Sequence, residues 1–400
     1  MLGVAELLLL GLLAELIFRR LRLPGLIGLL LVGLAVGPHA LGWVSPGFLA
    51  ASDELRMLAL VVILLRAGLQ IDRRSLNSLG RPAFLLSFFP GVCEGVAIFF
   101  LAPLWTPLSS LEAGLLGFVL AAVSPAVVVP MMIDLQERGL GVKKGIPTMV
   151  LAASSVDDVV AVVIFSVLLG VYVEGGDVVS RLMVELPFSL VSGVAVGVGL
   201  GVVLVLLFDR FNPRATKRLI GVLAVSIVLI QVERWLVSMN IWFSALMAIV
   251  TAGIVMLERR EAMAHELSEK LGKVWIFASV LLFILIGAQV DIGLAWEAGG
   301  VAVGLVLCGL LVRSAAVLVS VMGTSLTVRE RFFVMVSFWP KATVQAAIGA
   351  VPLAVMLERG WDTTAGEWIL AVAVVAILIT APAGALAIRW SAYRWLHSSR

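Results

Sequence analysis

Long apolar runs, separated by short polar stretches, dominate the pattern of hydrophobic and polar positions along this chain. Most runs extend over about 17 to 25 residues, which is the length that an α-helix needs to cross a hydrocarbon core of roughly 30 Å. The separating stretches are charged or contain Gly and Pro. We therefore predict an all-α polytopic membrane protein with thirteen transmembrane helices. Their approximate ranges are 2–18, 24–38, 56–70, 83–103, 112–132, 146–171, 185–207, 218–236, 241–257, 273–290, 299–321, 331–354 and 367–390.

Composition supports this interpretation and excludes several other classes. Hydrophobic residues make up 61% of the chain and charged residues 14%, against about 45 to 50% and about 25% in an ordinary soluble domain. The net charge of +3 is not accompanied by a basic amphipathic stripe or an RNA-binding signature. No GxxxxGK phosphate loop is present, and the three histidines are too scattered for a zinc site. We expect no nucleic-acid, nucleotide or cofactor binding, and no enzymatic activity.

The distribution of Lys and Arg predicts the orientation in the membrane. An odd number of spans places the two termini on opposite sides, and basic residues collect in cytoplasmic loops. Most of the 29 Lys and Arg residues fall in loops on the side of the C-terminus. The loops of the other side hold only Arg56, Arg181, Arg234 and Arg359. We expect a multi-pass protein with the N-terminus outside and the C-terminus in the cytoplasm, in a bacterial inner membrane rather than an organelle.

Thirteen spans also divide into six, one and six. The first six-helix repeat would cover residues 1–180, a linker helix region 181–214, and the second repeat 215–400. Seven steps separate corresponding spans, so the two halves would enter the membrane in opposite directions. This arrangement is an inverted repeat, which in secondary transporters places the binding site near the midplane, between paired discontinuous helices.

The fifth span of each half carries the proline pattern expected of such helices. Span 5 reads VSPAVVVP, with Pro125 and Pro130, and span 12 reads WPKATVQAAIGAVP, with Pro340 and Pro352. Proline removes a backbone donor and interrupts a helix. Single prolines are common in membrane helices, but matching positions in both halves favour a functional interpretation. We predict two crossed discontinuous helices, spans 5 and 12.

Adjacent aspartates in the middle of span 6 are the first candidate site. Asp157 and Asp158 lie within AASSVDDVVAVVIF, too far from either interface for short side chains to reach water. A charge at this depth costs roughly 2.5 to 3.5 kcal/mol even on a mild insertion scale. Desolvation and mutual repulsion both favour the protonated form, so the pair should titrate as a coupled unit. A proton and a small hard cation would then compete for the same oxygens. The alternative is a hydrogen-bonded pair that only joins two helices.

Three more charged residues stand out inside predicted spans. Lys341 stands beside the interruption of span 12, where helix C-termini gather negative charge that a cation offsets; a lysine that extends to the interface is the alternative. Glu94 and Arg313 occupy the fourth spans of the two halves, which are equivalent positions of the repeat. We predict that they form a buried ion pair with a structural or gating role, rather than binding a cation directly.

These residues stand in segments that resemble a known family. VSPAVVVPMM, GVKKGIPTMVLAASSVDD, LLFILIGAQVDI and FWPKATVQAAIGAV are similar to the NHA-type branch of the cation/proton antiporter superfamily, and the resemblance runs through most of the chain. It implies a homodimer in which a core that carries the discontinuous helices moves as an elevator against a fixed scaffold.

The resemblance also implies roles for individual residues. Asp158 would be the essential carboxylate for cation and proton, with Asp157 as its partner, and Ser124 and Ser155 would complete the ligand shell. Lys341 matches the crossing lysine of the family and, fixed as a cation, would hold Asp157 ionised.

The buried ion pair of the family matches Glu94 and Arg313. Many electrogenic bacterial relatives carry lysine where Arg313 stands. This difference predicts that one proton moves per sodium ion.

The expected function is therefore a secondary antiporter that exchanges Na⁺, and also Li⁺, for H⁺, with inorganic cations and membrane lipid as its partners. Three alternatives stay open from the sequence. They are a K⁺/H⁺ antiporter of the same fold, a passive cation channel, and a sodium-coupled organic-anion transporter of the related bile-acid fold.

Overall fold

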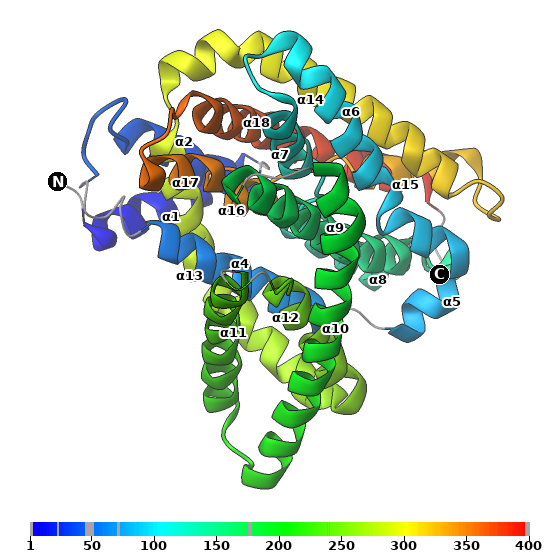
Figure 1. The fold of residues 1–400 in the computed structure, drawn as a ribbon. Coiled ribbons are helices and arrows are strands. Elements are labelled where there is room, and N and C mark those ends of the chain that lie inside the picture. Colours follow the sequence, from blue (N-terminus) through cyan, green and yellow to red (C-terminus); the bar gives the residue numbers. More distant parts are fainter. Residues whose placement is uncertain are drawn as a thin grey trace. The chain divides into compact units, whose positions relative to one another are not determined.

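The computed structural model describes residues 3–21, 24–44, 52–69, 73–174, 178–237, 239 and 241–396. Within these ranges the regular elements are helices, and no extended β-strand is present (Figure 1). The elements are α1 (Val4–Arg20), α2 (Gly25–Val36), α4 (Ser52–Gly68), α5 (Arg73–Leu86), α6 (Phe89–Trp105), α7 (Ser110–Leu120), α8 (Pro125–Glu137), the 3₁₀ helix η1 (Val142–Lys144), α9 (Ile146–Glu174), α10 (Val178–Phe211), α11 (Ala215–Val237), α12 (Ala245–Arg259), α13 (Glu261–Gln289), α14 (Ile292–Ser320), α15 (Val328–Ser337), α16 (Thr343–Ile348), α17 (Val351–Arg359) and α18 (Thr364–Trp395). The predicted all-α class is confirmed.

Seven helices in the described ranges are long and apolar enough to cross a membrane. They lie at Gly80–Trp105, Ile146–Val173, Pro187–Phe211, Ala215–Glu233, Glu261–Gln289, Gly299–Ser320 and Thr364–Trp395. Spans 5 and 12 fall below this length because each is divided into shorter helices, and α2 is a shorter apolar helix. The count of thirteen spans stays a prediction.

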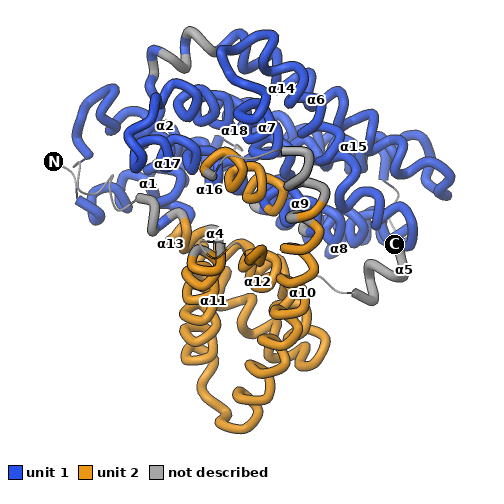
Figure 2. Tube along the Cα trace, in the orientation of Figure 1, with its two compact units in different colours: residues 1–56, 78–162, 279–400 blue, residues 57–77, 163–278 orange. Residues whose placement is uncertain are grey.

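The chain forms two compact units, which Figure 2 shows in different colours. Unit 1 consists of Met1–Arg56, Ser78–Val162 and Ser279–Arg400, and unit 2 of Met57–Asn77 and Val163–Ala278. Every described residue of the candidate site predicted above belongs to unit 1. This division follows contacts in space, whereas the predicted repeats follow the order of the chain, and the repeat boundaries stay a prediction.

The breaks in spans 5 and 12 follow from local sequence. Helix α7 ends at Leu120 and α8 begins at Pro125, where proline stands at the first helical position and its missing N–H costs no hydrogen bond. Helix α15 ends at Ser337, shortly before Pro340, and α16 begins only at Thr343. Pro130, expected as part of the first interruption, instead lies inside α8, which continues through it.

Buried apolar side chains hold these broken segments inside unit 1. One cluster joins Val123 at the first break and Val128 of α8 to Phe333 and Phe338 at the end of α15, and to Ile388 of α18. These five side chains are almost fully shielded from solvent. Helix α18 also contacts α7, α8, α14, α15 and α16, and α14 packs on α6. Both breaks are thereby enclosed by continuous helices.

A polar contact joins the 3₁₀ helix η1 to the start of α15. Glu330 forms a capping box with Thr327 at the start of α15, and Lys144 of η1 donates to Glu330 Oε2 at 2.7 Å. Burial acts to raise the pKa of Glu330, but the hydrogen bonds from Lys144 and Thr327 outweigh it, so the pKa lies below its ordinary value. The carboxylate is therefore stabilised in its charged form, just outside the predicted span that begins at 331.

This contact predicts a pH-dependent contribution to stability. Because the pKa of Glu330 is lower in the folded protein, its contribution is fully present above the unfolded value of about 4.3 and is lost as pH falls through the folded value. In detergent, the melting temperature of Glu330→Gln should be lower than that of wild type at pH 7, and the two should converge as pH falls below about 4. Glu112→Gln, which alters an exposed capping box, is the matched control. An unchanged difference between wild type and Glu330→Gln across this range would contradict the assignment.

Candidate functional site

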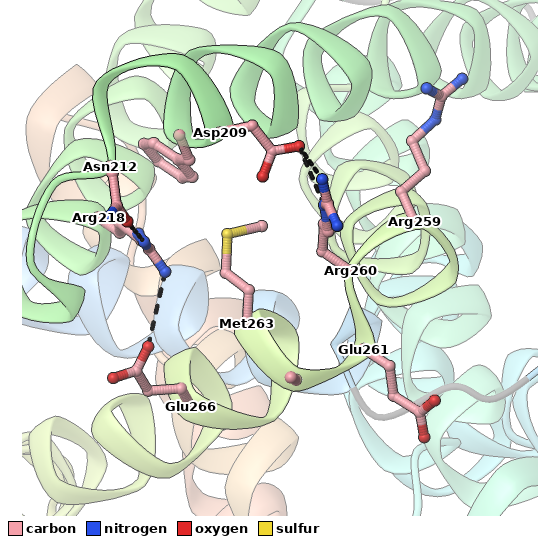
Figure 3. A pocket seen from close by; sticks show the side chains of 10 residues that line it. Asp209, Asn212, Arg218, Arg259, Arg260, Glu261, Met263 and Glu266 are labelled. Carbon is pink, nitrogen blue, oxygen red and sulfur yellow. Dashed lines mark hydrogen bonds and ion pairs between the residues drawn. The ribbon is translucent and has the colours of Figure 1, made fainter.

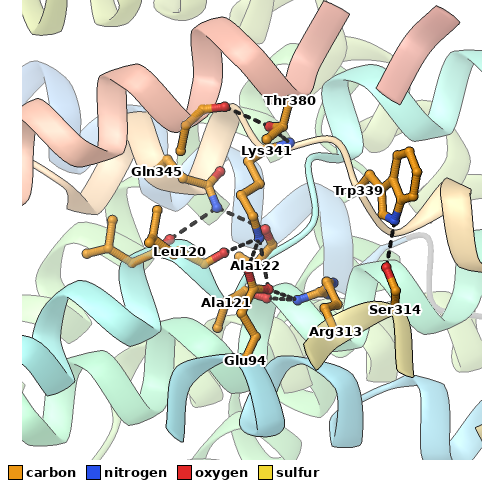
Figure 4. A network of polar contacts seen from close by, with 12 residues as sticks. Glu94, Leu120, Ala121, Ala122, Arg313, Ser314, Trp339, Lys341, Gln345 and Thr380 are labelled. Carbon is orange, nitrogen blue, oxygen red and sulfur yellow. Dashed lines mark hydrogen bonds and ion pairs between the residues drawn. The ribbon is translucent and has the colours of Figure 1, made fainter. Parts of the chain in front are cut away.

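The two helix breaks of unit 1 lie next to each other and are joined by hydrogen bonds (Figure 4). The backbone N–H of Ser124 donates to the carbonyl of Pro340 at 2.8 Å. The side-chain amide of Gln345 donates to the carbonyls of Val119 at 3.1 Å and Ala122 at 2.9 Å. Val119 lies in the last turn of α7, where helix carbonyls lack partners within the helix, and Ala122 lies in the first break. Pro340 in the second break and Gln345 in the helix that follows it therefore form hydrogen bonds with backbone groups at and beside the first break.

A group of buried charges lies beside the breaks. Arg313 of α14 donates to Glu94 Oε2 of α6 at 2.8 Å. Its other terminal nitrogen pairs with Asp157 Oδ2 of α9, and the nitrogen that contacts Glu94 also donates to the carbonyl of Ala121. Lys341 places its ammonium 2.7 Å from Glu94 Oε1 and also donates to the carbonyl of Leu120. The predicted contact between Glu94 and Arg313 is present, as part of a network of four charged residues.

The partner of Lys341 differs from the expectation. We expected Lys341 to hold Asp157 ionised, but its ammonium contacts Glu94, and Arg313 holds Asp157. A guanidinium presents several N–H groups in a planar fork, so Arg313 can contact two carboxylates at once. The side chains of Glu94, Arg313 and Lys341 are each 0% exposed. The charged groups of these three residues therefore contact other protein groups.

Asp158 is the carboxylate of this group that has no cation. It is 2% exposed, and neither of its oxygens has a hydrogen-bond partner among the described residues. The backbone amide of Val123, in the first break, lies near enough to interact with it electrostatically. The two cations of the network are already in contact with Glu94 and Asp157. A carboxylate buried in this way must hold a proton or bind a cation, because an isolated buried charge is very costly.

Further buried oxygens near the breaks have no partner among the described residues. Ser124 Oγ, Thr343 Oγ1 and Asp157 Oδ1 belong to this set. Ser124 is 0% exposed and stands beside Val123 in the first break. Hydroxyl and carboxylate oxygens are the donors that small hard cations prefer. The side chain of Ser155, which the sequence analysis also assigned to the ligand shell, lies outside what the structure describes.

Close helix packing brings the charged residues together, and two glycines permit it. A Cβ on Gly91 of α6 would lie 2.6 Å from Asp157 Oδ1, and one on Gly309 of α14 would lie 3.0 Å from Glu94 Oε1. Neither these glycines nor Gln345 were predicted from the sequence as residues of the site. Gly91 stands three residues before Glu94, and therefore on the same helical face, which is the signal that could have identified it.

Known proteins resemble this chain over most of its length. Residues 6–391 match the family described as sodium/hydrogen exchanger, transmembrane. Sodium/hydrogen exchanger 9B2 of Mus musculus is 35% identical over 348 residues, which cover 84% of this chain and 62% of the mouse protein. The protein of the same name from Homo sapiens is 34% identical over 378 residues, which cover 92% of this chain and 68% of the human protein. The chain thus spans less than two thirds of the mouse relative.

A solved structure shows the same fold. The sodium proton antiporter MjNhaP1 from Methanocaldococcus jannaschii superposes with a TM-score of 0.85 over 98% of this chain and 97% of that protein, at 19% sequence identity. At this identity the structural match shows the architecture alone. The family to which the chain belongs is shown by the family match and by the relatives above. With nearly the whole length matched, the chain belongs to the sodium/hydrogen exchanger family.

Proposed function

We propose that the protein is a secondary antiporter that exchanges Na⁺, and also Li⁺, for H⁺. One observation carries the proposal. Among the described residues, Asp158 is a buried carboxylate without a cation, beside a helix break with unpartnered oxygens, while the neighbouring carboxylates Asp157 and Glu94 are paired. Membership of a cation/proton exchanger family and the fold shared with an antiporter support it.

The charge balance of the site supports a one-to-one exchange. Arg313 stays protonated at any working pH, since arginine does not lose its proton in proteins. It is therefore able to keep Asp157 ionised through the whole cycle, and Lys341 does the same for Glu94. Asp158 is then the group that changes state, carrying a proton in one half of the cycle and Na⁺ in the other. One proton moves for each sodium ion, and the exchange is electroneutral.

Two further features of the transport cycle form part of the proposal. The paired breaks support a pair of crossed discontinuous helices at the centre of a thirteen-helix inverted repeat, which is a common basis for alternating access. The whole charged network lies inside unit 1, which supports movement of that unit as a rigid body in an elevator mechanism. The resemblance to the family implies a homodimer, and the Lys and Arg distribution favours a cytoplasmic C-terminus.

Electroneutral exchange gives a direct test in liposomes. We reconstitute the protein, set the membrane potential with K⁺ and valinomycin, and find the proton gradient at which sodium-driven proton movement stops. That gradient should equal the sodium gradient at every voltage, because no net charge crosses the membrane. An equilibrium that shifts with voltage would show that a second group, Asp157 or Lys341, also releases a proton.

The same liposomes distinguish the alternatives. With Na⁺, Li⁺ and K⁺ offered in turn, proton flux driven by Na⁺ and Li⁺ is the expected result. Flux driven by K⁺ alone would identify a K⁺/H⁺ antiporter of the same fold. Current without coupled proton movement would identify a passive channel, which the enclosed and paired charges near the breaks disfavour.

A further inference from the structure

A second polar feature of unit 1 lies far from the buried charges. A cavity of about 340 Å³ is formed by α8 and α18, with Asp134, Arg138, Arg389 and Tyr393 among its polar lining residues. Its remaining lining is apolar and includes Met131 and Ile388. A cavity with one polar and one apolar part fits a molecule with the same two parts.

The depth of this cavity follows from helix geometry. Asp134 lies nine residues after Pro125, where α8 leaves the first break, and Arg389 lies nine residues after Thr380, which accepts a hydrogen bond from the backbone of Lys341 at the second break. Nine residues of α-helix rise about 14 Å. Half the thickness of a hydrocarbon core is about 15 Å. With the breaks at the midplane, the polar part of the cavity lies at the level of the lipid headgroups.

Aromatic residues support this depth. Tyr393 and Trp390, next to the cavity on α18, are each 52% exposed. Tyr and Trp are enriched where a membrane protein passes from hydrocarbon to water. The guanidinium of Arg394 lies 4.8 Å from the ring centre of Trp390, which adds a cation to the same belt.

The charges of the cavity are not balanced. Arg138 donates to Asp134 Oδ1 at 2.8 Å and lies 5.8 Å from the ring centre of Tyr393. Arg389 has no ion-pair or hydrogen-bond partner among the residues that the structure describes. Among the described residues, Arg389 is therefore a positive charge at the headgroup level without an acidic partner, next to the apolar lining of the cavity.

A larger cavity in unit 2 provides a contrast (Figure 3). It has a volume of about 610 Å³, and two of its three arginines contact acidic side chains of the lining. Arg260 pairs with Asp209 at 2.8 Å, and Arg218 lies 3.7 Å from Glu266. Its lining holds three arginines and three acidic residues, so it offers no surplus charge to a ligand.

We propose that the cavity between α8 and α18 binds the phosphate-bearing headgroup of an anionic phospholipid, with Arg389 as the main contact and an acyl chain against the apolar lining. The lipid comes from the leaflet on the basic side of the membrane, which the positive-inside rule assigns to the cytoplasm. The site would attach a bilayer lipid to unit 1 itself. It is independent of which cation the protein transports.

Binding is measured on the purified full chain in detergent by native mass spectrometry and by melting temperature. Wild type should retain phosphatidylglycerol in preference to phosphatidylcholine and melt at a higher temperature in its presence. Arg389→Gln should bind about fivefold more weakly, which corresponds to about 1 kcal/mol for one basic residue near an anionic surface. Arg389→Lys, which keeps the charge, should lose less. Arg329→Gln removes an exposed charge near the start of α15, outside the cavity, and should bind as wild type does.

Three results would overturn the proposal. They are equal losses in Arg389→Gln and Arg329→Gln, no loss in Arg389→Gln, and equal stabilisation by inorganic phosphate and by phosphatidylglycerol. The last would identify a site for a free anion. Arg389 is exposed, so Arg389→Gln should have the same melting temperature as wild type when lipid is absent. Transport by the reconstituted variant is measured separately from lipid binding.

Discussion

Asp158→Asn should abolish sodium/proton exchange while the protein still folds. Asparagine keeps the volume of the side chain but cannot alternate between a protonated and a cation-bound form. No other described carboxylate of the buried group can replace it, because Asp157 and Glu94 are held by Arg313 and Lys341. In proteoliposomes with a pH-sensitive dye, sodium-driven proton flux should fall to that of protein-free liposomes. Asp157→Asn should impair the flux severely, since it removes the second carboxylate of the pair.

The matched control is Asp362→Asn, an identical substitution in the loop before α18. Asp362 interacts locally with Thr364 and lies outside the buried network. It should transport as wild type does. Asp158→Asn and Asp362→Asn should both elute as folded protein. Asp158→Asn should keep a wild-type melting temperature or a higher one, because a neutral side chain is cheaper to bury than a charge. Proton flux near wild type in Asp158→Asn would disprove the mechanism.

Replacing either Glu94 or Arg313 in the buried network should lower the stability of the protein more than any surface substitution does. Breaking a buried pair typically costs about 3 to 5 kcal/mol, because the remaining charge is left uncompensated. Glu94→Gln leaves Lys341 without its carboxylate, and Arg313→Ala leaves Asp157 without its cation. Both variants should therefore melt well below wild type in detergent.

A double-mutant cycle tests whether the two residues act together. Glu94→Gln combined with Arg313→Ala should lose less stability than the sum of the single variants, since residues in one network couple. Asp134→Asn is the control, because it breaks an exposed pair with Arg138 at the same 2.8 Å distance and exposed pairs contribute little. Strict additivity of the two buried substitutions would argue against the contact.

Much of the architecture was determined by the sequence alone. Apolar runs predicted helices, since only helices satisfy every backbone group within one segment that crosses a bilayer. The positions of Pro125 and Pro340 predicted both breaks, because proline cannot donate the hydrogen bond that continues a helix. Equivalent places in the repeat predicted the contact between Glu94 and Arg313, although 219 residues separate them. Each of these inferences depends on periodicity or on an intrinsic property of one residue.

The partners within the site were decided by the tertiary structure. Lys341 and Glu94 are 247 residues apart, and Gln345 and Ala122 are 223 apart. Which of them meet depends on how each helix is rotated about its axis and on how closely α6, α9 and α14 approach. A long side chain at a helix break can reach several carboxylates, and hydrophobic pattern does not distinguish among them. Only the packed helices assign Arg313 to Asp157 and Lys341 to Glu94, and thereby leave Asp158 as the carboxylate that has no cation in the part of the chain that the structure describes.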